Sequence, residues 1–409
     1  MKTLSVENSH HKWTFASRFR RQAFGWRSAL PIQRLKEAVT EIKLAARTDP
    51  VLAANGAILL LEKLSPALEQ VDSSSGALGS AVTRAIDLLV PIIAAPDVAE
   101  SVREMWLERL FDALQEDRIP YIEQLGEFWG QLCVTPAIAS AWADRLLGIT
   151  TRVLGPDGHG EFFTGTTGCL SAIYGAQRYD ELIRLVDSAR LNWWHYRRWG
   201  VDALVALGRP AEALRYAQAS QETNAPAGAV AKACDAILLA SGMVDEAYTR
   251  YAIEANEGAT YLATFRAIVR KYPHKLPGDI LHDLVVSAPG SEGKWFAAAK
   301  DAGLYDLAVS LAKQGPTDPR TLTRAAKDFG VSEPEFAMSC GLSSLHWMSA
   351  GYGYDIARAD VLDAYAAVAR AGETLGIATT EINTRIRAQL GNHGADRSVV
   401  AEVLSHQLR

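Results

Sequence analysis

The stretch Leu207-Gly208-Arg209-Pro210-Ala211-Glu212-Ala213 decides the fold of this chain, because its pattern returns twice. In each copy a glycine precedes an alanine by five residues. A glycine in the left-handed conformation ends one helix, and a small alanine lets the next helix cross the first closely. The pattern therefore predicts pairs of helices joined by short turns. The later copies are Ser241-Gly242-Met243-Val244-Asp245-Glu246-Ala247 and Ala302-Gly303-Leu304-Tyr305-Asp306-Leu307-Ala308.

The spacing of the copies is that of a helical repeat. Ala213 and Ala247 are 34 residues apart, and Ala247 and Ala308 are 61 apart, which leaves room for a divergent repeat that turns near Tyr272-Pro273. A period near 34 is typical of helix–turn–helix repeats that bury their apolar faces only by stacking. A looser copy precedes the others at Tyr174-Gly175-Ala176-Gln177-Arg178-Tyr179-Asp180-Glu181-Leu182.

These helix pairs resemble tetratricopeptide repeats over about residues 165–315. The turn glycine and the packing alanine match that family, and Tyr251 stands where the family usually has an aromatic residue. The family's regular tryptophan and the second glycine of its first helix are missing, so a similar α-solenoid is the alternative. The resemblance implies a fold and a habit of binding partners, and it implies no reaction.

Helical patterns also dominate the rest of the chain. We expect an all-α fold of stacked antiparallel helical hairpins behind an N-terminal helical domain. Pro50, Pro96 and Pro136 are expected at helix starts, where a missing N–H costs nothing. The helices outside the repeats are predicted at 33–47, 51–69, 77–94, 97–114, 121–132 and 136–154, and at 319–329, 333–348, 358–375, 380–390 and 397–407.

The chain is predicted to have five parts. Gly155-Pro156-Asp157-Gly158-His159-Gly160 cannot continue a helix, and it lacks the spacing of a phosphate-binding loop, so it is interpreted as a linker. The parts are a basic aromatic arm (1–30), an N-terminal HEAT-like or bundle domain (31–154), the linker (155–162), the tetratricopeptide-like repeats (163–315) and a C-terminal helical cap (316–409).

Composition favours an ordered cytoplasmic protein. The 409 residues are 48% hydrophobic with a net charge of −5, which argues against a nucleic-acid coat protein. No run of 18 apolar residues and no secretory signal are found, so no membrane span is expected. The alanine- and arginine-rich composition fits a bacterial protein. Four dispersed cysteines, Cys133, Cys169, Cys234 and Cys340, indicate buried free thiols in a reducing compartment.

The basic arm is the first candidate site. Between residues 8 and 36 there are seven cations and no acid, interleaved with Trp13, Phe15, Phe19, Phe24 and Trp26. Cations beside aromatic rings suit phosphate neutralisation and base stacking. The alternative is an amphipathic helix that docks its rings on the first helices and leaves its arginines in solvent. The residues predicted to bind nucleic acid or an acidic partner are Lys12, Arg18, Arg20, Arg21 and Arg27.

The second candidate is the segment Trp193-Trp194-His195-Tyr196-Arg197-Arg198-Trp199. On a helix its arginines could clamp a carboxylate or phosphate while tryptophans stack on the ligand. Alternatively, the tryptophans fill the space between helix pairs and the arginines pair with acids such as Asp187. The side chains surround the helix, so one face must lie at the surface or in an interface. The residues predicted to bind a partner are Trp193, Trp194, His195, Arg197, Arg198 and Trp199.

No catalytic, metal-binding or cofactor-binding pattern is found. The nine histidines form no H-E-x-x-H motif and pair with no cysteine at ligand spacing, and no G-x-S-x-G motif is present. We therefore expect a non-enzymatic helical-repeat scaffold without a cofactor, which binds a protein partner on its concave face. A nucleic-acid-associated protein that uses the basic arm is the alternative. The identity of the partner and the oligomeric state do not follow from these residues.

Overall fold

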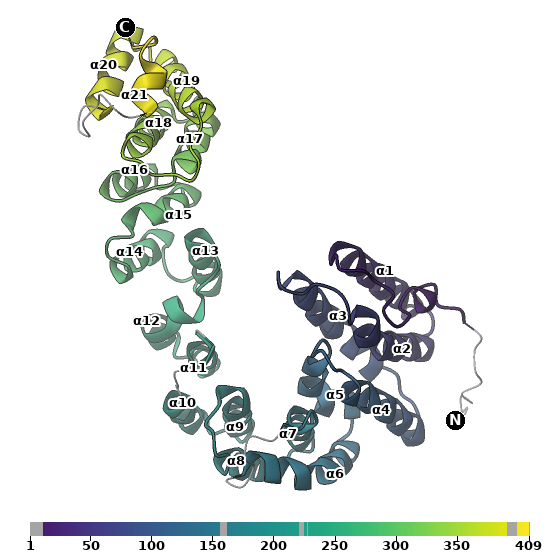
Figure 1. Ribbon diagram of the computed structural model, residues 1–409. Helices are drawn as coiled ribbons and strands as arrows, with labels where there is room; N and C mark the ends of the chain where they lie inside the picture. The colour runs from purple at the N-terminus through teal and green to yellow at the C-terminus, as the bar shows by residue number, and fades with distance from the viewer. Residues whose placement is uncertain (1–10, 156–161, 221–224, 227, 391–398, 409) are drawn as a thin grey trace. The chain divides into compact units, whose positions relative to one another are not determined.

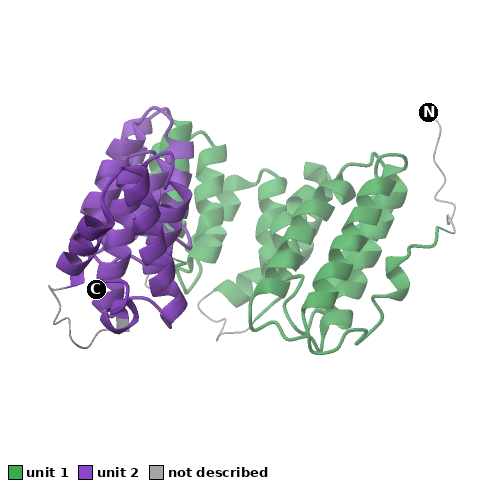
Figure 2. Ribbon diagram, turned by 90° about the horizontal axis from the view of Figure 1, so that it is seen from above, with its two compact units in different colours: residues 1–241 green, residues 242–409 purple. Residues whose placement is uncertain are grey.

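The computed structural model describes residues 11–155, 162–220, 225–226, 228–390 and 399–408. Within these ranges the protein has 21 α-helices, three short 3₁₀-helices and no strand (Figure 1). The all-α class predicted from the sequence is therefore confirmed. By its internal packing the chain divides into two compact units, residues 1–241 and 242–409 (Figure 2).

The first unit reproduces the predicted N-terminal helices to within a few residues, except that the one expected at 121–132 is a 3₁₀-helix followed by a short α-helix. Its elements are η1 (Phe15–Ser17), α1 (Ala29–Ala45), α2 (Pro50–Leu68), α3 (Ala77–Ala94), α4 (Glu100–Gln115), η2 (Glu123–Phe128), α5 (Trp129–Cys133), α6 (Pro136–Leu154), α7 (Thr166–Gly175), α8 (Tyr179–Asp187), α9 (Trp194–Ala206), α10 (Pro210–Ala219) and α11 (Ala229–Ala240).

In the second unit a turn falls at the expected place, because Tyr272-Pro273 lies between α13 and α14. Its elements are α12 (Val244–Ala255), α13 (Tyr261–Lys271), α14 (Pro277–Ser287), η3 (Glu292–Trp295), α15 (Phe296–Asp301), α16 (Tyr305–Gln314), α17 (Pro319–Asp328), α18 (Pro334–Ser349), α19 (Arg358–Thr374), α20 (Thr379–Leu390) and α21 (Val399–Leu404).

The boundary between the two units lies at a different place in the sequence from the predicted linker. Helix α6 packs directly against α7, and the Arg190 amide donates to the Leu154 carbonyl at 2.9 Å, so the chain on both sides of 155–162 shares one core. Residues 156–161 of that linker lie outside the described residues. The division falls instead between Ser241 and Gly242. The five predicted parts stay a prediction.

The repeated turns have the conformation that their glycines predict. Gly208, Gly242 and Gly303 have φ angles of 72°, 76° and 72°. The residue after each glycine repeats as well, because Arg209, Met243 and Leu304 have ψ angles of 55°, 57° and 67°. The three alanines that follow, Ala213, Ala247 and Ala308, are fully buried. The left-handed turn and the closely packed alanine are therefore both present in each copy.

The looser copy makes the same turn without a glycine. Gln177 has a φ of 60°, and Arg178 after it has a ψ of 52°. Gly175 is the last residue of α7 and touches Gly130 of α5. A glycine is needed at residue 175 because two helix backbones meet there.

Prolines start helices at two of the three expected places. Pro50 and Pro136 begin α2 and α6, behind Asp49 and Thr135, whose side chains accept hydrogen bonds from the amides of Leu52 and Ile138. This is the arrangement that satisfies the free amides of a helix start. Pro96 differs, because α4 begins only at Glu100.

Two described helices, α2 and α3, are long and apolar enough to cross a membrane by length and composition. Their most apolar windows are 61% and 39% buried inside the protein. Each is interrupted by only two charged residues, which is why averaged hydropathy identifies them although no uninterrupted apolar run exists. Core helices of water-soluble proteins have the same composition.

Candidate functional site

The predicted partner-binding segment forms the first two turns of α9. Trp194 and Trp199 are buried, at 7% and 6% exposure, and Trp199 packs near Tyr174 of α7 with ring centroids 6.0 Å apart. Trp193 precedes the helix, is 45% exposed and stacks on Tyr196 at 6.0 Å. Two of the three tryptophans therefore fill the space between helices, and one remains at the surface.

Arg197 is held by three groups on α8 and α10. Its Nη1 donates to Asp187 Oδ1 at 2.5 Å and its Nε donates to Ser220 Oγ at 3.1 Å. The guanidinium lies 3.8 Å from the ring centroid of Tyr216, whose hydroxyl donates to the same Asp187 oxygen at 2.6 Å. Burial and then the Asp187 hydrogen bond raise the pKa of Tyr216. The ion pair with Asp187 is the one that the sequence suggested.

Arg198 and His195 face the other side of α9. Arg198 Nη2 lies 2.9 Å from Glu127 Oε1 of η2, and His195 Nε2 lies 3.1 Å from Thr167 Oγ1 of α7. Desolvation by the surrounding protein and then the positive charge of Arg198 lower the pKa of His195, while Glu127 acts in the opposite direction. His195 is therefore neutral at pH 7.

The six predicted residues are thus brought together, but as supports of their neighbours. Both arginines already hold a carboxylate, so a ligand anion would have to displace Asp187 or Glu127. Breaking a partly buried ion pair costs more than the exchange of an exposed one, and the Arg197–Asp187 pair is also hydrogen-bonded. The assignment of these residues to partner binding stays a prediction.

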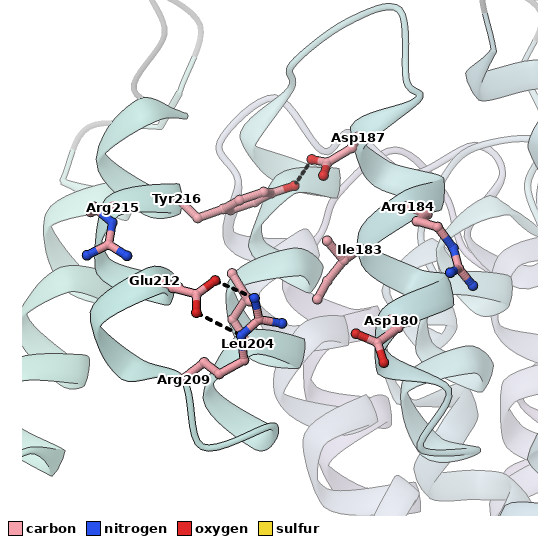
Figure 3. A pocket seen from close by; sticks show the side chains of 9 residues that line it. All are labelled: Asp180, Ile183, Arg184, Asp187, Leu204, Arg209, Glu212, Arg215 and Tyr216. Carbon is pink, nitrogen blue, oxygen red and sulfur yellow. Dashed lines mark hydrogen bonds and ion pairs between the residues drawn. The ribbon is translucent and has the colours of Figure 1, made fainter.

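A hollow of about 560 Å³ opens between α8, α9 and α10 (Figure 3). Two of its lining residues, Asp187 and Tyr216, are the ones that contact Arg197. Within the hollow Arg209 donates both hydrogen bonds of a paired contact to Glu212, and Tyr216 reaches Asp187 across the upper part of the view. Its walls carry three acids, three arginines, one tyrosine and two aliphatic residues: Asp180, Asp187, Glu212, Arg184, Arg209, Arg215, Tyr216, Ile183 and Leu204.

The neighbouring turn differs from the one beside this space. Arg178, which occupies the same turn position as Arg209, donates to Glu181 within its own helix start and also to Asp144 and Ser140 of α6, at 2.6 and 3.1 Å. That arginine bridges two helices.

Arg209 makes the contact within its own helix start but not the contact to the preceding helix pair. It donates to Glu212, and Asp180 of α8 acts on it only through its charge, without a hydrogen bond. Arg178 therefore ties its turn to the preceding helix pair, whereas the described contacts of Arg209 stay within its own helix start. Sequence reasoning missed this hollow, although the repeated spacing of arginine and glutamate at 178/181 and 209/212 was a usable signal.

The basic arm is docked on the first helices. Trp13, Phe15, Phe19 and Phe24 are buried, while Trp26 is 71% exposed. The docking of aromatic rings matches the second interpretation of this segment. Its described part between residues 11 and 28 has one short 3₁₀-helix, however, where an amphipathic helix was considered. Backbone hydrogen bonds fix it, from the Gln22 amide to the Pro66 carbonyl at 2.9 Å and from the Asp72 amide to the Trp26 carbonyl at 2.8 Å.

Acids of α1 and α2 neutralise part of the arm. Arg18 pairs with Glu37 at 2.9 Å, and Arg21 lies 3.8 Å from Glu69. Arg34, just after the arm, shares Glu37. Of the five predicted binding cations, Lys12, Arg20 and Arg27 remain exposed, and no ion pair of theirs is found in the described chain. The positive charge that the arm presents to a polyanion is therefore smaller than the number of its cations indicates, because acids of the protein lie beside two of them.

Replacing Gly56 by alanine should loosen this arm. A Cβ atom at Gly56 would lie 2.3 Å from Cζ2 of Trp13, whose buried indole covers α2 there. We expect a loss of about 1–3 kcal/mol in unfolding free energy and faster trypsin cleavage after Lys12 and Arg18. Limited trypsin proteolysis of the folded protein measures the rate of this cleavage. Gly79→Ala, in open space on α3, is the control; equal cleavage of both variants would contradict the docking of Trp13.

Thiol and metal chemistry find no support among the described side chains. Burial raises the pKa of Cys133 and Cys340 to about 12 and that of Cys169 to about 11, so these thiols are not nucleophiles at neutral pH. No group of three or more His, Cys, Asp or Glu side chains in the described ranges is placed to hold a metal ion.

Comparison with models of known protein families finds no match, and comparison with curated proteins finds none either.

Proposed function

We propose that this protein is a non-enzymatic, cytoplasmic scaffold of stacked antiparallel helix pairs, similar to tetratricopeptide repeats, which binds a segment of a protein partner. The observation that carries the proposal is the hollow between α8, α9 and α10, with Ile183, Leu204 and Tyr216 in its walls. A volume of about 560 Å³ is large enough for one or more side chains of a bound segment.

The charges of the hollow favour a protein over a nucleic acid. Its three acids and three arginines cancel, whereas a surface that neutralises phosphates is uniformly positive. A mixed rim around apolar groups is typical of protein interfaces, where complementary charges select the partner and apolar contacts supply affinity.

In this proposal Arg197 of α9 does not contact the partner but holds a wall of the hollow in place. Asp187 and Arg197 hold the Tyr216 ring in place from two sides, through a hydrogen bond and a cation–π contact. A wall that is already ordered loses little side-chain entropy when a partner binds. Tyrosine and arginine are also the residues that most often dominate interface energies.

The test is photocrosslinking in the native host. A photoreactive amino acid at Ile183 should capture a protein, and the capture should be lost when the pair on the hollow's wall is reversed, as Arg209→Glu with Glu212→Arg. The matched control reverses Glu246 and Arg250, another exposed ion pair within one helix, α12, and keeps the same net charge. Failure to capture any protein, or equal loss in both reversed variants, would refute the proposal.

One observation favours the alternative, which is nucleic-acid binding through the arm. Trp26 and Arg27 are adjacent in the sequence and both are exposed. Deleting residues 1–28 would also remove buried aromatic rings, so the cleaner variant is Lys12→Gln, Arg20→Gln and Arg27→Gln. Our proposal predicts unchanged capture at Ile183 in this variant. The alternative would be favoured by a nuclease-sensitive complex whose affinity depends less steeply on salt concentration in the triple variant than in the original protein.

A further inference from the structure

A second hollow, of about 600 Å³, lies within the second unit between α16 and α18. It occupies the same place in the order of helices as the first. Each hollow begins at the helix that follows a left-handed residue, Gln177 before α8 and Gly303 before α16, and extends to the second helix after it, α10 or α18. The two hollows differ in their chemistry.

The wall of this second hollow has an ordered apolar part. Phe336 is buried and its ring lies 4.8 Å from that of Tyr305 and 5.4 Å from that of Phe329. Leu304 and Leu307 are half-buried beside it. Interlocked rings at these separations fix one another in offset or edge-on contact. The hollow therefore offers a preformed apolar surface.

The charged part of the wall has a single sign. Asp306, Glu333 and Glu335 are exposed, and no arginine, lysine or histidine is among the ten lining residues. In the described chain, no side-chain hydrogen bond or ion pair of these three acids is found. Other acids of the same unit are paired, as Asp301 is with Arg266 and Asp360 with Arg320.

The positions of two of these three acids are explained by the helix starts at which they lie. Asp306 and Glu335 lie in the first turns of α16 and α18, where a carboxylate is favoured by the helix dipole. That effect falls off within one turn and gives no reason for both helices to direct unpaired acids at one apolar hollow. Charge complementarity supplies the reason: a cationic group seated there would meet three carboxylates and no competing cation.

We propose that the hollow between α16 and α18 docks a protein segment in which a large apolar side chain is flanked by lysine or arginine. The apolar side chain would rest on Phe336, Leu304 and Leu307, and the flanking cations would pair with the three acids. This site goes beyond the proposed function, because it lies in the other unit and its chemistry selects a basic segment. Its binding does not depend on the first hollow.

The proposal can be tested with synthetic peptides and the full-length protein. The probe is a fluorescein-labelled 12-residue peptide with a central Phe-Leu flanked by two lysines on each side. Two matched peptides carry glutamate for the lysines or serine for Phe-Leu. The protein variants are Asp306→Asn/Glu333→Gln/Glu335→Gln and, as the control with equal charge, Glu254→Gln/Glu257→Gln/Glu373→Gln, whose acids are exposed elsewhere in the second unit.

Fluorescence anisotropy should show binding of the Phe-Leu-lysine peptide alone among the three. Neutralising the three hollow acids should weaken it roughly tenfold, since each exposed pair contributes a small factor. The control variant should bind within about twofold of the original protein. No binding of the probe, equal weakening in both variants, or equal binding of the serine peptide would each overturn the proposal. None of these outcomes depends on the crosslinking at Ile183.

Discussion

Replacing Arg103 by methionine should lower the free energy of unfolding of the first unit by about 3–5 kcal/mol. The Arg103 side chain is buried on α4 and donates to three carbonyls at the end of α3: Ile93 at 2.6 Å, Pro96 at 2.8 Å and Ala94 at 3.4 Å. These are carbonyls that a helix end leaves without partners. Methionine fills a similar volume but donates nothing, so buried carbonyls would lose their hydrogen bonds.

Besides those carbonyls, the Trp106 ring supports the charge of Arg103, with the guanidinium carbon 5.1 Å from the ring centroid. Burial lowers the pKa of Arg103, while the neighbouring Cys133 acts in the opposite direction. Arginine nevertheless stays protonated in proteins, because its pKa begins above 12. The loss in the methionine variant is therefore a loss of donors at every pH where the protein folds.

Denaturant unfolding followed by tryptophan fluorescence measures this effect. Arg145→Met is the matched control, because Arg145 also lies over a tryptophan, Trp142, at 4.5 Å but pairs with Glu108 at the exposed surface. The control should lose no more than about 1 kcal/mol. If Arg103→Met were as mild as Arg145→Met, the three carbonyl contacts would not be holding the end of α3.

Gly130→Ala should lower the free energy of unfolding of the first unit by about 3 kcal/mol, at the upper end of the usual cost of overpacking. A Cβ atom at residue 130 would lie 2.3 Å from the Ser171 carbonyl oxygen and 3.1 Å from Gly175 Cα. The obstacles are backbone atoms of α7, which cannot rotate away as a side chain can. Ser171 also ties the crossing together, since its hydroxyl accepts from the Gly130 amide at 3.0 Å and donates to the Glu127 carbonyl at 2.9 Å.

Gly148→Ala is the control for this crossing. Gly148 lies within α6, is exposed, and has open space where a Cβ would be. Alanine there should raise stability by about 0.5–1 kcal/mol through helix propensity alone. Gly175→Ala, approaching the same crossing from α7, should repeat the loss seen at Gly130. A neutral Gly130→Ala would show that α5 and α7 separate easily.

The positions of the helices could be predicted from the sequence because they depend on neighbours along the chain. The helices predicted at 77–94 and 136–154 coincide with α3 and α6, and that predicted at 319–329 exceeds α17 by one residue. Glycine at a left-handed turn and proline behind a capping side chain act within one helical turn. The predicted turns and starts therefore hold at Gly208, Gly242, Gly303, Pro50 and Pro136.

Tertiary structure decided everything that depends on residues distant in sequence. The sequence by itself determined an all-helical chain with repeated turns and buried packing alanines, since periodicity and capping are local. It did not determine that Gly175 would meet Gly130, that Glu37 and Glu69 would neutralise arginines of the arm, or that Arg197 and Arg198 would find Asp187 and Glu127. Such contacts depend on how helices cross, and one pattern of apolar residues permits many crossings. The two hollows follow from those crossings.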